Sequence, residues 1–171
     1  MENKILIQHY QSPCGELVLG SRGDRLCLCN WVVEKHPGRV ERRLQHLLGA
    51  RYEQAPSPVV EEAVRELEQY FRGERKEFGV PLLFAGTGFQ QRVWTGLQEI
   101  AYGTTLSYAA LAAQIGHPSA VRAVANANGA NALSIFVPCH RVIGSNHSLT
   151  GYGGGMAAKK FLLELERRYS L

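Results

Sequence analysis

The 171-residue sequence lacks the features that mark membrane, secreted or repetitive proteins. No apolar run reaches the roughly 20 residues that a membrane-spanning helix needs. The N-terminal residues 1–4 are not a charged segment followed by an apolar one, so no secretory signal is visible. Internal repeats and low-complexity stretches are also missing. We therefore expect a cytoplasmic protein with no membrane partner, built from one domain or two small ones.

Cysteine is scarce, and the spacing of the four cysteines gives only weak support for a metal site. Cys27 and Cys29 alternate within an expected strand, so they should share one face. A zinc ion held by this pair with Cys14, His9 or His36 is one alternative, but a C-x-C without a second pair is a weak signal. Disulfides are rare in a reducing cytosol. We predict no bound metal.

An excess of acidic residues is also absent from the second half of the chain. Residues 1–85 hold 12 Lys and Arg and 12 Asp and Glu, whereas residues 86–171 hold 7 and 3. The whole net charge of +4 therefore lies in residues 86–171. A basic half suits a polyanionic partner such as DNA, although a soluble basic surface would give the same count.

Residues 1–85 predict a small α/β domain. Three short strands at 4–10, 16–20 and 26–33, joined by tight turns, indicate a three-stranded antiparallel sheet. A helical pattern covers 37–48. A second helix should begin at Ser57 and Pro58, which are suited to the N-cap and the first helical position, and should end at Gly73.

Residues 86–171 predict a mostly helical domain. Apolar periodicity indicates helices over 89–100, 108–115 and 120–128, with Ser107 and Ser119 as N-caps. Two short helices joined by a Gly-containing turn form a helix-turn-helix, whose second helix usually contacts DNA. The same spacing also occurs in helix pairs that bind no DNA.

The stretch around Cys139 holds the strongest chemical signal in the chain. The apolar residues 133–137 predict a buried strand that Pro138 ends, which places Cys139 at the strand end. His140 and Arg141 follow at once, and nearby cations lower a cysteine pKa and raise its thiolate fraction. A small buried apolar cysteine is the alternative.

The motif Pro-Cys-His-Arg-Val around Cys139 resembles the active-site signature of the O6-alkylguanine-DNA alkyltransferases, the methylated-DNA–protein-cysteine methyltransferase family. Further segments resemble the same family in the same order, over about residues 87–166: Phe89-Gln-x-x-Val93-Trp94, Ser107-Tyr108-x-x-Leu111-Ala112, Arg122-Ala123-Val124, Asn131, Tyr152-x-Gly154-Gly155 and Lys159-x-Phe-Leu-Leu-x-x-Glu166. The resemblance implies an α+β protein, with an N-terminal ribonuclease H-like domain and a C-terminal winged helix-turn-helix domain.

The resemblance also implies a reaction and its residues. Cys139 attacks the alkyl carbon on O6 of guanine, and His140 removes the thiol proton through a water. Glu166 orients and stabilises the imidazole, an arrangement of nucleophile, base and orienting group. Asn131 takes a structural position, and Tyr108 donates a proton toward the purine ring. The alkyl group stays on Cys139 as a thioether, so the protein acts once and needs no cofactor.

The resemblance implies duplex DNA containing O6-alkylguanine, with O4-alkylthymine a possible second substrate, as the partner of a monomer. The target base must leave the stack to be reached, and Arg122 is the candidate to fill the gap. The residues implied to contact the DNA are Arg122, Ala123, Ser119 and Asn126. Those implied to form the substrate pocket are Val142, Tyr152, Gly153 and Lys159.

Three other functions fit parts of the pattern. A non-catalytic binder of DNA lesions would have the same fold but lack Cys139. A cysteine hydrolase would need Cys139 and His140 to pair, and adjacent residues at a strand end point in different directions. A transcription regulator would use the helix-turn-helix, but no effector domain is visible. Alkyl transfer is the function that the residues favour.

Overall fold

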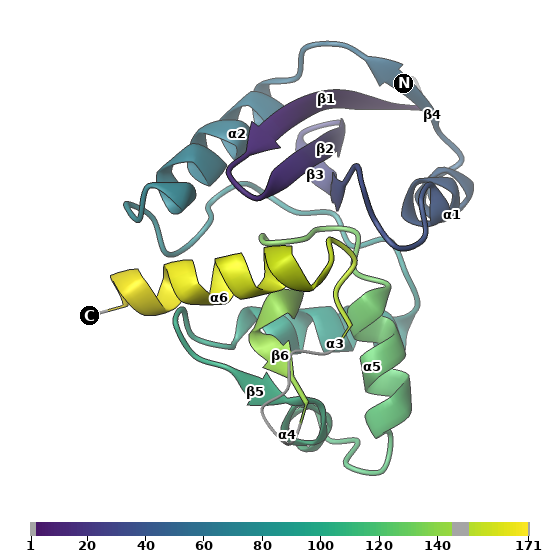
Figure 1. Ribbon diagram of the computed structural model, residues 1–171. Coiled ribbons are helices and arrows are strands. Elements are labelled where there is room, and N and C mark those ends of the chain that lie inside the picture. The colour runs from purple at the N-terminus through teal and green to yellow at the C-terminus, as the bar shows by residue number, and fades with distance from the viewer. Residues whose placement is uncertain (1–2, 145–150, 171) are drawn as a thin grey trace.

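A four-stranded sheet forms the centre of the N-terminal half of the computed structural model, which describes residues 3–144 and 151–170 (Figure 1). Strands β1 (Lys4–Ser12), β2 (Gly15–Arg22) and β3 (Arg25–Trp31) pair antiparallel, as predicted. A fourth strand, β4 (Arg51–Gln54), pairs parallel with β1. The predicted three-stranded antiparallel unit is therefore present, the fourth strand was not predicted, and the strand order is β3-β2-β1-β4.

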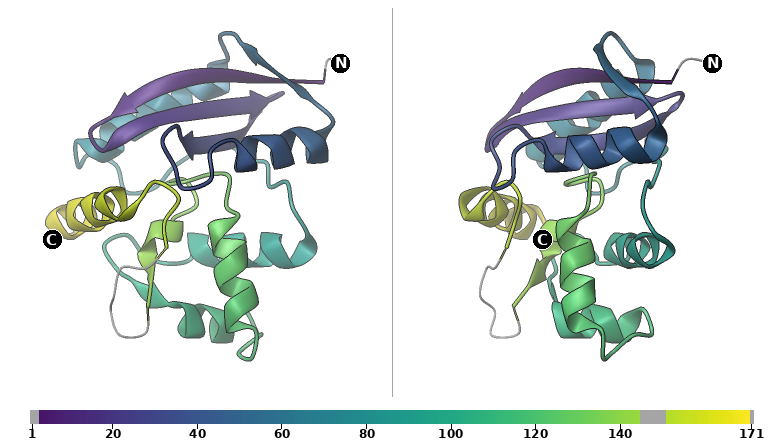
Figure 2. Two further views of the ribbon diagram at one scale, coloured as in Figure 1. Left: turned by 45° about the vertical axis from the view of Figure 1, so that its right-hand side comes forward. Right: turned by 90° about the vertical axis from the view of Figure 1, so that its right-hand side faces the viewer.

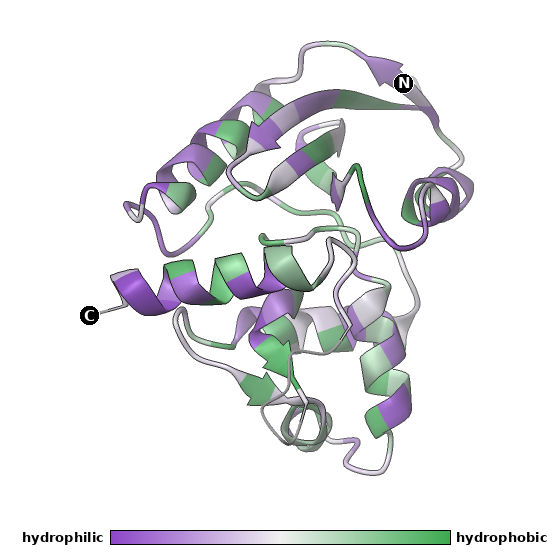
Figure 3. Ribbon diagram, viewed as in Figure 1, coloured by the Kyte–Doolittle hydropathy of each residue, from purple (hydrophilic) through white to green (hydrophobic). Residues whose placement is uncertain are grey.

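Two helices accompany this sheet. Helix α1 (Arg39–Leu48) begins two residues later than predicted, because Gly38 has a left-handed φ of 79°. Helix α2 (Pro58–Phe71) begins as predicted, with the Ser57 hydroxyl accepting a hydrogen bond from the Val60 N–H. The apolar side of α2 contacts β1, β2 and β3, and Figure 3 shows the alternation of apolar and polar residues along it.

The two cysteines of β3 do not share a face as predicted. The pairing of β2 with β3 shifts between Gly20 and Ser21, so that Cys27 is the extra residue of a β-bulge. The bulge breaks the alternation of the strand, and Cys27 and Cys29 pack into different hydrophobic clusters. Among the described residues, no group of three or more His, Cys, Asp or Glu side chains is placed to hold a metal ion.

The C-terminal half is mainly helical, with α3 (Gly88–Gln98), α4 (Tyr108–Gln114), α5 (Val121–Gly129) and α6 (Met156–Tyr169). Helices α4 and α5 contact each other as the predicted helix-turn-helix pair. The Ser107 hydroxyl caps α4 as predicted. Ser119 does not cap α5, because the helix begins one residue later and Ala120 is its N-cap. None of the helices in the described ranges is long and apolar enough to cross a membrane.

The segment before Cys139 folds back on itself, so the predicted strand over residues 133–137 was wrong. Ile135 has a φ of 73°, which is rare for a β-branched residue, and the chain reverses there. The Val137 N–H donates to the Leu133 carbonyl at 2.8 Å. The run is nevertheless buried, as its apolar character indicated. Two-residue strands β5 (Leu106–Ser107) and β6 (Val142–Ile143) pair parallel nearby.

The two halves meet along β3 and α6. The Cys29 N–H donates to the Ala132 carbonyl, and the Ser134 N–H donates to the Cys29 carbonyl, so β3 contacts the fold-back segment. Helix α6 lies below the sheet in Figure 1, and the views of Figure 2 show it at one side of the molecule, next to the other helices. The mixed α+β architecture, with a sheet in the N-terminal half and helices in the C-terminal half, is confirmed.

Candidate active site

Cys139 begins the short 3-10 turn η1 (Cys139–Arg141), directly after the fold-back segment. Asn131 holds this segment in place. Its side-chain amide donates to the Val137 carbonyl at 2.9 Å, and its side-chain oxygen accepts from the Leu133 N–H at 3.0 Å. The Cys139 residue is 6% exposed and lies in the wall of a cleft. The fold therefore presents a nearly buried thiol to a cavity.

The charged neighbours of the thiol are not the ones that the sequence suggested. Burial raises the pKa of Cys139, while a hydrogen bond from Asn131 and the charge of Lys159 act in the opposite direction. The prediction that His140 and Arg141 lower this pKa was wrong. The Arg141 side chain lies on Glu166 and on the Ile100 carbonyl instead. The thiol therefore rests protonated and needs a base during the reaction.

Glu166, on α6, is the centre of a buried polar network. Its Oε2 atom lies 2.7 Å from His140 Nε2, and both side chains are fully buried. Arg141 donates from Nε to Oε1 at 2.8 Å and from Nη2 to Oε2 at 3.0 Å. The Tyr70 hydroxyl donates to Oε2 at 2.6 Å. Burial opposes ionisation of the carboxyl, but His140 and Arg141 hold its pKa well below the usual range.

These contacts define the state of the His140 ring. The ionised carboxylate only accepts hydrogen bonds, so His140 Nε2 carries the proton that it donates to Glu166. Burial lowers the pKa of His140, which favours the neutral ring. His140 Nδ1 is buried and hydrogen-bonds to no described residue. A neutral imidazole with a free lone pair on Nδ1 is suited to accept a proton.

The cleft in front of Cys139 has a volume of about 1030 Å³ and extends to α1 and α5. It brings together seven of the residues that the sequence predicted for the site: Tyr108, Ala123, Asn126, Asn131, Cys139, Tyr152 and Gly153. Val142 and Lys159 do not line it. Lys159 is fully buried, and its ammonium group donates to the Val142 carbonyl at 2.7 Å, so both lie behind the cleft wall.

The other two predicted DNA contacts lie on the surface of the helix-turn-helix. Arg122 is exposed on α5, and Ser119 is exposed in the turn before it. Ala123 and Asn126 of the same helix face the cleft. One helix therefore carries an exposed cation and part of the wall in front of Cys139.

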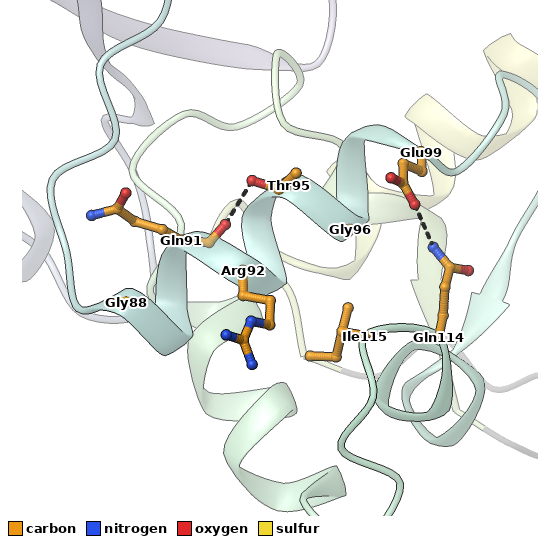
Figure 4. Close-up of a pocket in the computed structure, with 8 residues that line it drawn as sticks. All are labelled: Gly88, Gln91, Arg92, Thr95, Gly96, Glu99, Gln114 and Ile115. Atoms are coloured by element: carbon orange, nitrogen blue, oxygen red, sulfur yellow. Dashed lines mark hydrogen bonds between the residues drawn. The ribbon is translucent and has the colours of Figure 1, made fainter.

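A second, smaller hollow of about 430 Å³ lies between α3 and α4 (Figure 4). Within α3, the Thr95 hydroxyl donates to the Gln91 carbonyl. The side-chain amide of Gln114 on α4 donates to the Glu99 carboxylate and so links the two sides of the hollow. Among the described residues, its lining contains Arg92 and Glu99 but no cysteine or histidine. The candidate chemistry therefore belongs to the cleft at Cys139.

Sequence reasoning missed the contribution of the N-terminal half to the site, which includes Tyr70 and Trp31 as well as residues of α1 that line the cleft. Tyr70 contacts Glu166, and the indole N–H of Trp31 donates to the Tyr152 hydroxyl at 3.2 Å. Tyr70 follows the apolar pattern of α2, so its spacing predicts only a core position. Trp31 ends a buried strand, so its position in the sequence also predicts only a core residue. No local signal marks a contact between residues 96 or 121 positions apart.

This fold and site define a class of protein in which a helix-turn-helix lies beside a buried cysteine. The cysteine is followed by a histidine that is hydrogen-bonded to a buried glutamate. Two family models match the chain. Residues 5–84 match the ribonuclease-like domain of 6-O-methylguanine DNA methyltransferase, and residues 88–168 match the DNA-binding domain of the same protein. The chain therefore belongs to the 6-O-methylguanine DNA methyltransferase family.

Curated and solved relatives agree with this assignment. The constitutive methylated-DNA–protein-cysteine methyltransferase of Bacillus subtilis is 44% identical, and the match covers 92% of each chain. The methylated-DNA–protein-cysteine methyltransferase of Mycobacterium bovis is 45% identical, and the match covers 93% of this chain and 92% of the relative. The crystal structure of Mycobacterium tuberculosis OGT in complex with DNA is 42% identical with a TM-score of 0.81, covering 95% of this chain and 93% of that one.

Proposed function

We propose that the protein repairs alkylated DNA by moving the alkyl group from O6 of guanine to its own Cys139. Family membership supports the reaction class, because the relatives named above are methylated-DNA–protein-cysteine methyltransferases. The observation that carries the choice of residue is the buried Cys139 beside the hydrogen-bonded pair His140 and Glu166. The activity is that of a methyltransferase that acts once, since the acceptor is a residue of the protein.

The proposed chemical step is a displacement at carbon. His140 takes the thiol proton at Nδ1, relayed by a water, while the sulfur attacks the alkyl carbon. The new S–C bond forms as the C–O6 bond breaks, and the electron pair stays on guanine. The Tyr108 hydroxyl gives a proton to the guanine anion, and the proton that His140 took from Cys139 then returns to the Tyr108 oxygen. The products are a thioether at Cys139 and unmodified guanine, and no cofactor is consumed.

The other cleft residues bind and orient the base in this proposal. Tyr152 packs on its face, and the backbone of Gly153 contacts its edge, since both line the cleft with Cys139. Asn131 holds the turn that carries the nucleophile. Val142 and Lys159 act from behind the wall, where the Lys159 charge favours the thiolate of Cys139.

Duplex DNA is the partner, and α5 is its proposed docking element. Arg122 and Ser119 are exposed there, while Ala123 and Asn126 continue toward the cleft. A base must turn out of the duplex to enter a cleft, and Arg122 occupies the gap that it leaves. Acceptance of O4-alkylthymine remains part of the proposal.

The two proposed domains correspond to the two segments that match the family models. We place a scaffold domain at residues 1–85 and a DNA-binding and alkyl-transfer domain at 86–171, a boundary that lies between the two family matches. The protein acts as a monomer in the cytoplasm. Cys14, Cys27, Cys29 and Cys139 are all free thiols.

A labelled substrate tests the function directly. Duplex DNA with O6-[³H]methylguanine should transfer one label per protein molecule, and a peptide mass spectrum should place it on Cys139. The variant Cys139→Ala should take up no label. The variant Cys14→Ser removes another free thiol and should react like the wild type. Label on Cys139→Ala, or repeated turnover by the wild type, would overturn the proposal.

A further inference from the structure

One residue of the N-terminal half contacts the acid that supports the proposed base. Glu166 Oε2 receives three donors: the Tyr70 hydroxyl at 2.6 Å, His140 Nε2 at 2.7 Å and Arg141 Nη2 at 3.0 Å. Tyr70 lies on α2, so the contact joins the two halves of the chain. The Tyr70 hydroxyl and the His140 ring therefore share one oxygen atom of the carboxylate.

The direction of the Tyr70 hydrogen bond is fixed. Tyr70 is fully buried, and burial together with the charge of Glu166 raises the pKa of its hydroxyl well above the usual value. The hydroxyl therefore keeps its proton and donates it to the carboxylate. A donor to an ionised acceptor makes a stronger hydrogen bond than a neutral pair does. Each donor on Oε2 lowers the electron density that the oxygen offers to the others.

We propose that Tyr70 is a positioning residue for alkyl transfer, which sets through Glu166 how strongly the His140 ring holds a proton. The inference rests on the proposed function, because it assigns His140 as the base for Cys139. Without the Tyr70 hydroxyl, Oε2 is a better acceptor and stabilises the protonated ring more. The ring then stays protonated, and unable to act as a base, up to a higher pH.

Other charged groups around the ring remain in place when this hydroxyl is removed. Glu166 and Lys159 of α6 act on His140, as does Arg141 of the same turn. Cys139 precedes the ring in the chain. Tyr102 lies close to Glu166 and Tyr70 from the segment after α3. The substitution Tyr70→Phe leaves all five of these residues unchanged.

The packing of Tyr70 is separable from its hydroxyl. Its ring meets Phe71, Phe78 and Tyr102 at centroid distances of 5.3, 5.5 and 6.3 Å. Phenylalanine at position 70 keeps these contacts. The Tyr102 hydroxyl is buried and hydrogen-bonds to no described residue, so Tyr102→Phe removes a hydroxyl from the same cluster without changing the donors on Glu166. This variant is the matched control.

The test is the rate of a single turnover with free O6-benzylguanine from pH 5 to pH 9, which avoids DNA binding. In the wild type the rate should rise with pH to a plateau as His140 loses its proton. In Tyr70→Phe this acid limb should move up by about half to one pH unit, which slows the reaction about three- to tenfold below the limb. Tyr102→Phe should keep the wild-type limb.

A second substitution separates the effect of the hydroxyl from any effect of misfolding. Placing 3-fluorotyrosine at position 70 keeps the ring and strengthens the hydroxyl as a donor, so the acid limb should move to lower pH. Thermal unfolding reports any structural effect separately. The role of Tyr70 is overturned if the acid limb stays in place in both variants at position 70. It is also overturned if the wild-type pH profile has no acid limb. A wild-type protein that never forms benzyl-Cys139 contradicts the proposed function itself.

Discussion

Trp31 and Tyr152 join the two halves of the protein beside the nucleophile. The indole N–H of Trp31 donates to the Tyr152 hydroxyl, and the rings meet edge to face with centroids 6.0 Å apart. Gly154 lies so close that a Cβ atom there would stand 2.7 Å from the indole ring. A strand of the sheet therefore supports the loop that forms one wall of the cleft.

This contact predicts that Gly154→Ala disturbs both the fold and the cleft. The added methyl group displaces the indole or the loop, and overpacking of this kind costs about 1–3 kcal/mol. Urea unfolding should show the loss, and the reaction with free O6-benzylguanine should slow because Tyr152 moves. For comparison, a Cβ at Gly153 meets no atom of a described residue within 4 Å, so Gly153→Ala should change stability little. Equal stability of the two variants would contradict this account of the wall.

Arg122 offers a prediction about duplex DNA. Its side chain is exposed on α5 and is proposed to fill the gap left by the target base. Unstacking a base costs a few kcal/mol, so Arg122→Ala should slow repair in a duplex about tenfold or more. The rate with free O6-benzylguanine should stay within about twofold of the wild type, because no base then leaves a stack.

Arg51→Ala is the control for the loss of a positive charge, since Arg51 is an exposed cation on β4 in the other half. Its variant should repair duplex DNA at nearly the wild-type rate. If Arg122→Ala slowed both substrates equally, Arg122 would support the fold or the chemistry rather than base extrusion.

Local signals in the sequence predicted the helices well, and a motif singled out the residues proposed for the chemistry. Ser57 and Ser107 cap their helices as expected, because a hydroxyl before an apolar periodic run satisfies a free backbone N–H. The motif predicted roles for Cys139, His140 and Glu166, and the fold brings His140 and Glu166 into hydrogen-bond contact. Their separation along the chain alone would not have paired them.

What the sequence missed depends on contacts between distant segments. Strand β4 is short and polar, and only its pairing with β1 makes it a strand. The reversal at Ile135 contradicts the β preference of its residue type and is held by the hydrogen bonds of Asn131. Arg141 was expected to act on the neighbouring thiol, but the buried carboxylate of Glu166 attracts it more strongly.

The buried carboxylate predicts a large effect on stability. Glu166→Gln removes the negative charge that pairs with Arg141, whose side chain is only 7% exposed. Leaving one partner of a buried ion pair alone costs about 3–5 kcal/mol, which urea unfolding at pH 7 measures. Glu164→Gln changes the same residue type on the exposed side of α6 and should cost less than about 0.5 kcal/mol. Similar losses for both would argue against a structural ion pair at Glu166.

The stability of the protein should fall in acid in two steps. The pKa of His140 is below its ordinary value because burial favours the neutral ring, so the unfolded chain binds a proton there first as the pH falls below about 6.5. The pKa of Glu166 is also depressed, so its contribution is present above about pH 4.5 and is lost at lower pH. Each unit of difference between the folded and unfolded pKa contributes about 1.4 kcal/mol.

Urea unfolding between pH 8 and pH 4 separates the two groups. His140→Gln keeps a donor toward Glu166 but does not titrate, so its stability should decline less between pH 6.5 and pH 5 than that of the wild type. His36→Gln removes an exposed histidine and should retain the wild-type decline. If the decline were the same in all three proteins, His140 would not be held neutral by burial. An equal decline would mean that the folded and unfolded chains bind the His140 proton over the same pH range, near the ordinary pKa of about 6.5.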